Sequence, residues 1–208
     1  MGGKPDLGIE LDDLAADPMV QFRVWFDDAE AEGIHLANAI ALATADASGA
    51  PAVRHVLLRG FDDRGFVFYT NRESRKGRHL AQNPRAAFAV FWKELDRQVC
   101  VTGRVAEVSA AESDAYYASR PREARIGAWA SRQSDVLPDR AALMSMFAEA
   151  DERYRGDDVP RPPFWGGYRI TPDDVEFWHA RMFRLHDRFR YSRDPAADGG
   201  WRIERLSP

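Results

Sequence analysis

The sequence predicts a mainly β protein with peripheral helices, in which antiparallel strands form a closed or split barrel. Many short runs rich in β-branched and aromatic residues follow one another, separated by turn sequences such as Ser48-Gly49. Strands and helices do not alternate regularly, as a doubly wound parallel sheet would require. The chain has 208 residues, of which 45% are hydrophobic and 12% aromatic, so one domain can bury a sizeable core.

The first sixteen residues are rich in Gly, Pro and Asp, and we expect a mobile N-terminal segment at 1–16 followed by a single domain at 17–208. This domain begins with Asp17-Pro18, a pair that favours the start of a helix. Apolar residues then recur at helical spacing up to Gly33, where we expect the helix to end.

Strand-like runs dominate the rest of the chain, with helices in between. We expect strands at 39–45, 52–61, 66–70, 86–92, 98–108, 167–170, 175–178, 184–191 and 201–206. We expect helices at 74–82, 110–119, 123–131 and 139–154. The proline-rich stretch 160–163 predicts a rigid linker before the last strands.

Composition excludes several classes of protein. A formal net charge of -4 argues against a general nucleic-acid binder, which would carry a basic patch. The single cysteine, Cys100, lies in an apolar run and cannot form a disulfide within the chain, which suits a reducing cytoplasm. We find no targeting signal, no apolar run long enough to span a membrane and no histidine spacing typical of a metal site, so we expect a cytoplasmic protein without a metal.

A phosphate site is predicted where Ser74-Arg75-Lys76 begins a helix. Ser74 can cap the helix while free backbone N–H groups and two cations face the same space. An ordinary capped surface helix would have a similar sequence, so this pattern alone leaves both interpretations open.

A second cationic group is predicted near the C-terminus. If residues 184–191 form a strand, its two-residue period places Arg184, His186 and Arg188 on one face. Two guanidinium groups beside an imidazole suit an anionic ligand that needs a proton relay, whereas the alternative is a solvated strand face with a chance histidine.

Other polar residues stand where a flat ligand could use them. Arg54 and Gln98 lie in apolar strand-like runs, where burial without partners would cost about 1–3 kcal/mol each. Gln133-Ser134 and Trp178 offer an amide, a hydroxyl and an apolar wall suited to a heteroaromatic ring. Exposure at a sheet edge is the alternative explanation for Arg54 or Gln98 taken singly.

These residues belong to a longer series of motifs through which the chain, from about Asp17 to Pro208, resembles the pyridoxamine 5′-phosphate oxidase family. The motifs include Arg54-His55-Val56-Leu57-Leu58, Ser74-Arg75-Lys76-Gly77, Arg97-Gln98-Val99, Ser119-Arg120-Pro121, Gln133-Ser134, Trp165-Gly166-Gly167, Glu176-Phe177-Trp178 and Arg184-Leu185-His186-Asp187-Arg188. The resemblance implies an antiparallel FMN-binding split β-barrel that forms a homodimer through a C-terminal dimerisation and active-site region.

The resemblance also implies the site. FMN would be held by residues from both subunits, at the positions Arg54, Tyr69, Thr70, Arg75, Lys76, Gln98, Gln133, Ser134, Trp178 and Arg188. The substrate would contact Arg59, Tyr116, Arg120, Arg184 and His186, of which Arg184 and His186 would orient the pyridine ring and assist proton removal. The implied reaction converts pyridoxine 5′-phosphate or pyridoxamine 5′-phosphate to pyridoxal 5′-phosphate, by hydride transfer to flavin N5 and reoxidation by O2.

The chain departs from the family's pattern on the substrate side. Arg59 replaces a usual lysine, Ala124 replaces a serine, residues 179–183 are bulkier and more apolar, and the family's N-terminal lid motif is not visible in 1–16. One alternative is therefore the same FMN oxidase chemistry on another substrate, as in the related phenazine-biosynthesis oxidases. A non-catalytic flavin-binding protein is a third alternative, and the sequence leaves open the alcohol or amine preference and the electron acceptor.

Overall fold

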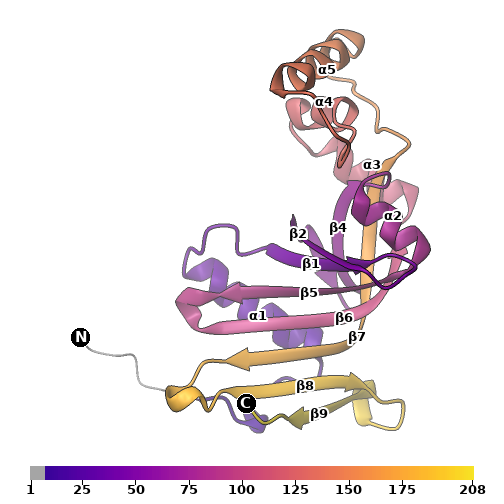
Figure 1. Ribbon diagram of the computed structural model, residues 1–208. Helices are drawn as coiled ribbons and strands as arrows, with labels where there is room; N and C mark the ends of the chain where they lie inside the picture. Colours follow the sequence, from indigo (N-terminus) through magenta and orange to yellow (C-terminus); the bar gives the residue numbers. More distant parts are fainter. Residues whose placement is uncertain (1–7) are drawn as a thin grey trace.

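The computed structural model describes residues 8–208, which form one antiparallel sheet with helices around it (Figure 1). The α-helices in this part are α1 (Pro18–Ala31), α2 (Arg75–Gln82), α3 (Ala110–Ala118), α4 (Arg122–Ala130) and α5 (Arg140–Arg153). The strands are β1 (Ala39–Ala45), β2 (Pro51–Leu57), β3 (Gly60–Asp62), β4 (Gly65–Asn71), β5 (Arg85–Trp92), β6 (Arg97–Glu107), β7 (Trp165–His179), β8 (Asp187–Arg193) and β9 (Trp201–Arg205).

The sheet curls into a split barrel. Its main strand order is β2-β1-β5-β6-β7-β4-β3, and β8 and β9 extend it from the second half of β7. The end strands of this order, β2 and β3, are separated in the chain by only Leu58 and Arg59, so the sheet has to curve until its two ends approach each other. The prediction of a mainly β split barrel with peripheral helices is confirmed.

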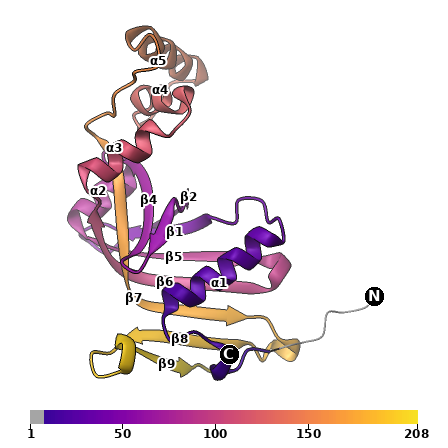
Figure 2. The ribbon, with the colours of Figure 1, turned by 180° about the vertical axis from the view of Figure 1, so that it is seen from behind.

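Aromatic side chains fill the inside of the curl. Phe22 of α1 packs edge-on against Phe66 of β4, with 4.9 Å between ring centroids, and Phe66 packs in the same way against Phe88 of β5. Helix α1 lies along the sheet and supplies its apolar face to this core (Figure 2). It begins where the sequence predicts, because the Asp17 side chain accepts a hydrogen bond from the Met19 amide.

Two strand predictions need correction. The expected strands 167–170 and 175–178 are one long strand, β7, which continues past Pro172 because the register with β6 shifts at Gly103. A bulge tolerates a residue that has no N–H to donate. The expected strand 52–61 is instead two strands, β2 and β3, which pair with different neighbours.

The prediction that Arg184, His186 and Arg188 share one strand face is wrong. Residues Met182–Arg184 form a 3-10 turn, and β8 begins only at Asp187. Phe183 and Arg184 have φ angles of 60° and 64°, which are left-handed and interrupt the extended period.

Helices α4 and α5 pack on each other at one end of the molecule, away from most of the sheet (Figure 1). Their own small core is made by Ile126, Ala130, Ala150 and Val159. Among residues 8–208 no helix is long and apolar enough to cross a membrane.

The expected mobile segment 1–16 is described in part. Its first seven residues lie outside the described residues. From residue 8 onward it contacts the C-terminal strands, where the Ile9 amide donates to Asp187 and the Tyr191 hydroxyl donates to the Ala15 carbonyl.

Candidate functional site

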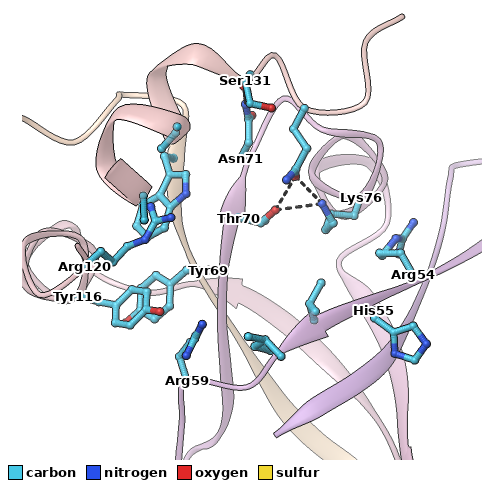
Figure 3. Close-up of a pocket in the computed structure, with 17 residues that line it drawn as sticks. Arg54, His55, Arg59, Tyr69, Thr70, Asn71, Lys76, Tyr116, Arg120 and Ser131 are labelled. Carbon is cyan, nitrogen blue, oxygen red and sulfur yellow. Dashed lines mark hydrogen bonds between the residues drawn. The ribbon is translucent and has the colours of Figure 1, made fainter. Parts of the chain in front are cut away.

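A pocket of about 540 Å³ opens between β2, β4, the start of α2 and helices α3 and α4 (Figure 3). It contains eight of the residues that the sequence predicts, namely Arg54, Arg59, Tyr69, Thr70, Lys76, Tyr116, Arg120 and Gln133. Cationic side chains lie at both of its ends, and the rings of Tyr69 and Tyr116 lie at the end that holds Arg59 and Arg120.

Lys76 is the centre of one end. Its Nζ donates to the Thr70 hydroxyl at 3.0 Å and to Gln133 Oε1 at 2.6 Å, the two dashed contacts at Lys76 in Figure 3. The side chain is buried, and burial together with the nearby Arg54 lowers the pKa of Lys76 to about 8. In the described part of the chain no carboxylate lies within ion-pair distance of this amine, so the end of the pocket has unbalanced positive charge.

The first turn of α2 is built as the sequence predicts. The Ser74 hydroxyl caps the helix by accepting from the Gly77 amide, and the Arg75 amide donates to Ser134 Oγ at 3.1 Å. The Arg75 side chain is exposed beside the pocket. These contacts fix Arg75 and Ser134 next to Lys76.

Arg54 completes this end from β2. Its Nη1 donates to the Leu42 carbonyl at 3.1 Å and to the Thr44 hydroxyl at 2.8 Å. Burial, and then the charge of Arg75, lowers the pKa of Arg54. Neutral partners orient the guanidinium without cancelling its charge, which leaves it available to an anion.

Gly77 sets the position of α2. A Cβ added there would overlap the Arg72 backbone carbonyl, so we expect Gly77→Ala to displace the first helical turn. The variant should lose about 1–3 kcal/mol of stability, and its Tm should fall by roughly 2–10 °C in a thermal scan. Gly127→Ala is the matched control and should be neutral or stabilising, because an added Cβ would meet no described atom within 4 Å apart from its chain neighbours and its own helix backbone.

Aromatic stacking forms the other end of the pocket. Tyr69 stacks on Tyr116 with 4.0 Å between ring centroids and on Trp165 with 5.5 Å. Arg120 lies 4.9 Å from the Trp165 ring, and its buried Nη1 has no hydrogen-bond partner among residues 8–208. Burial lowers the pKa of Arg120. A buried guanidinium nitrogen without a partner is costly unless an anion binds it, so this end also fits an anionic group.

Sequence reasoning missed several residues that line this pocket, among them His55, Asn71, Ser131 and Trp165. Trp165 opens the motif Trp165-Gly166-Gly167, and Asn71 directly follows the strand that carries Thr70. The Trp165 motif and the position of Asn71 after the strand were both visible in the sequence. That these two residues lie together in the pocket follows only from the pairing of β4 with β7, which places Asn71 opposite Trp165.

The remaining predicted residues form a second cluster on the outer face of the sheet. Register places Gln98 of β6 beside Trp178 of β7, and Trp178 beside Arg188 of β8. The His186 ring lies 4.6 Å from the Trp178 ring, and Arg184 is exposed nearby in the 3-10 turn. None of these five residues lines the pocket within one chain.

Arg188 is held on this outer face by Glu176, at 2.8 Å from Nε. This carboxylate raises the pKa of Arg188. Cys100 is half-buried on the same face and accepts a 3.4 Å contact from the Gln98 amide.

The fold and the pocket define a class: a split-barrel protein with a pocket for a ligand that carries anionic groups and a flat ring. A family model described as pyridoxamine 5′-phosphate oxidase matches residues 26–154, and one described as pyridoxine 5′-phosphate oxidase C-terminal dimerisation region matches residues 165–208. The chain belongs to the pyridoxamine 5′-phosphate oxidase family.

Individual relatives agree with this assignment. A protein from Burkholderia multivorans named pyridoxine/pyridoxamine 5′-phosphate oxidase is 56% identical over 196 residues, which cover 94% of this chain and 91% of the relative. PhzG from Burkholderia lata 383, solved in complex with tetrahydrophenazine-1-carboxylic acid, is 34% identical, with a TM-score of 0.90 and full coverage of both chains. An FMN-binding protein from Nostoc punctiforme shares the fold at a TM-score of 0.73 and 19% identity.

Proposed function

We propose that this protein is an FMN-dependent oxidase that converts pyridoxine 5′-phosphate or pyridoxamine 5′-phosphate to pyridoxal 5′-phosphate. The observation that carries the proposal is one pocket with two separate cationic ends, Lys76 with Arg54 at one and Arg120 with Arg59 at the other. A flavin mononucleotide and a phosphorylated substrate would each bring one phosphate to this pocket.

The Lys76 end fits the FMN phosphate. It combines a buried ammonium group to which no carboxylate of the described residues is paired, a capped helix start and hydroxyl groups within reach. Thr70, Arg75, Gln133 and Ser134 would complete this binding site, with Arg54 beside them. Bound FMN would accept a hydride from the substrate and pass the electrons to O2, which gives hydrogen peroxide.

The Arg120 end fits the substrate phosphate. Its unpartnered Nη1 and the nearby Arg59 supply charge, and Tyr116 supplies a hydroxyl on the stacked aromatic wall. Arg184 and His186 would orient the substrate ring from the other side. They lie outside the pocket of their own chain, so a second subunit would have to supply them.

The outer face of the sheet supports a homodimer. Val53 and Phe91 expose 70% and 57% of their surfaces there, and the positions between them along the sheet carry small residues such as Ala43 and Ala89. Such an apolar surface is typical of a subunit interface. Because Gln98, Trp178 and Arg188 lie on the same face, a second copy covering it would bring them towards a neighbouring pocket.

A second candidate function keeps FMN and changes the substrate. PhzG is solved with a tetrahydrophenazine carboxylic acid, and a carboxylate is also an anion that Arg120 could bind. Arg59 and Ala124 line the pocket where the family pattern has a lysine and a serine, which favours this alternative. The 56% identity to a protein named pyridoxine/pyridoxamine 5′-phosphate oxidase favours the first function.

The test is anaerobic mixing of FMN-loaded protein with each of the two phosphorylated substrates and, separately, with a dihydrophenazine carboxylic acid. We expect the oxidised-flavin absorbance to bleach with the phosphorylated substrates, and pyridoxal 5′-phosphate to appear once oxygen is readmitted.

Arg59→Ala with Arg120→Ala should raise the KM by at least about 100-fold, since each hydrogen bond to a charged group contributes about 1.5–3 kcal/mol. Bleaching only by a dihydrophenazine carboxylic acid would support the second function, and bleaching by neither class would contradict both.

A further inference from the structure

Asp187 joins three segments of the chain next to His186. It is 8% exposed at the start of β8, and its Oδ2 accepts from the Ile9 amide at 3.1 Å. Its Oδ1 accepts from Arg205 Nη1 at 2.8 Å, and Arg181 Nε lies 3.6 Å from Oδ2. One carboxylate therefore links the N-terminal residues, the turn before β8 and the last strand.

The imidazole of His186 has one nitrogen occupied by the backbone. The Arg181 amide donates to Nδ1 at 3.1 Å, and the ring lies against Trp178. A nitrogen that accepts from an amide carries no proton, so the neutral ring must carry its proton on Nε2. Nε2 is then a hydrogen-bond donor.

Arg181 contacts both His186 and Asp187. Its backbone N–H fixes Nδ1 of His186, while its guanidinium interacts with Asp187. Gly8 packs directly against the same guanidinium, where an added Cβ would overlap it. The turn that contains Arg184 lies between Arg181 and His186, and the contacts of these two residues hold its ends. Phe183 and Arg184 in this turn have left-handed backbone angles, which need such contacts to be maintained.

We propose that Asp187 is a positioning residue that, through Arg181, sets the tautomer of His186, and that His186 acts on the substrate as an Nε2–H donor and not as a base. This role rests on the proposed function, in which His186 contacts the substrate ring. The acceptor on the substrate is an electronegative atom, such as a ring oxygen substituent or a carboxylate.

The first measurement is the tautomer itself. Long-range ¹H–¹⁵N correlation spectra of FMN-loaded protein labelled on histidine, with His186→Leu to assign the ring, should show the Nε2–H form without any substrate. Asp187→Asn should convert this signal to a tautomer mixture, whereas Asp173→Asn, which loses a contact to Arg85 far from the turn, should leave it unchanged. A protonated Nδ1 in the unaltered protein would overturn the proposal.

Kinetics gives the second measurement. Asp187→Asn should raise the KM by about tenfold with a smaller change in kcat. His186→Gln, whose amide N–H reaches about as far as Nε2, should retain about tenfold more kcat/KM than His186→Leu. Equal losses in both variants would overturn the donor role. If neither phosphorylated substrate reacts but the tautomer responds to Asp187→Asn as expected, the proposed function fails while the positioning role stands.

Discussion

Replacing Lys76 with methionine should weaken FMN binding by at least about 100-fold and at the same time stabilise the ligand-free protein. The loss of affinity follows because a buried ammonium group that faces a phosphate makes charge-assisted hydrogen bonds that methionine cannot make. The gain in stability follows because burial lowers the pKa of Lys76 to about 8, which shows that the folded protein disfavours the charged amine. Equilibrium dialysis of FMN and thermal scans of ligand-free protein measure the two effects.

The pH dependence of the stability effect has a defined sign. The ordinary lysine pKa is 10.5, so between about pH 8 and 10.5 the unfolded chain binds more protons at this position than the folded chain does. The destabilisation by Lys76 is therefore complete below about pH 8 and disappears as the pH rises towards 10.5. At pH 7 we expect Lys76→Met to gain on the order of 1–3 kcal/mol, and this gain should shrink in alkaline buffer.

Lys93→Met is the matched control, because Lys93 is exposed and its ammonium group lies 3.8 Å from the exposed Glu94 carboxylate. It should change neither FMN affinity nor stability measurably. A Lys76→Met protein that binds FMN normally would contradict the assignment of this end of the pocket to the phosphate. A Lys76→Met protein less stable at pH 7 than the unaltered one would show that the hydrogen bonds of Nζ outweigh its desolvation.

The sequence predicted the strands well wherever one face is buried. Strand β1 has alternating buried and half-buried residues, and its predicted bounds 39–45 are those of the structure. The strand prediction failed at Pro172, because a proline normally ends a central strand. The bulge at Gly103 that accommodates this proline involves two paired strands, so the sequence of one strand does not reveal it. The prediction also failed at the start of the expected strand 184–191, because Phe183 and Arg184 take left-handed backbone angles that composition does not predict.

The site was predictable in part. Ser74, Arg75 and Lys76 are local in sequence, so helix capping rules identified them before any tertiary contact was known. The proximity of Arg120 to Trp165 depends on how α3 and β7 pack, for which no periodicity gives a signal. Residue type identified Gln98 and Trp178 as candidate ligand contacts and the resemblance assigned them to FMN, but within one chain they lie on the outer face of the sheet.

A heterodimer made from one Lys76→Met subunit and one Arg184→Asn subunit should have about half the activity of the unaltered dimer, although each variant homodimer should have less than about 1%. Lys76 lines the pocket, whereas Arg184 lies outside the pocket of its own chain. If each site takes Lys76 from one subunit and Arg184 from the other, this heterodimer keeps one site with both residues intact. Asparagine is chosen because it tolerates the φ of 64° at position 184.

The reciprocal heterodimer is the control, with both substitutions in one subunit and none in the other. Shared sites predict that it is inactive, because each of its two sites then lacks one of the two residues. Sites built within single chains predict the opposite pair of results, with the first heterodimer inactive and the reciprocal one at about half activity. Two different affinity tags, purified in sequence, isolate each heterodimer, and its rate per dimer at saturating FMN decides between the two arrangements.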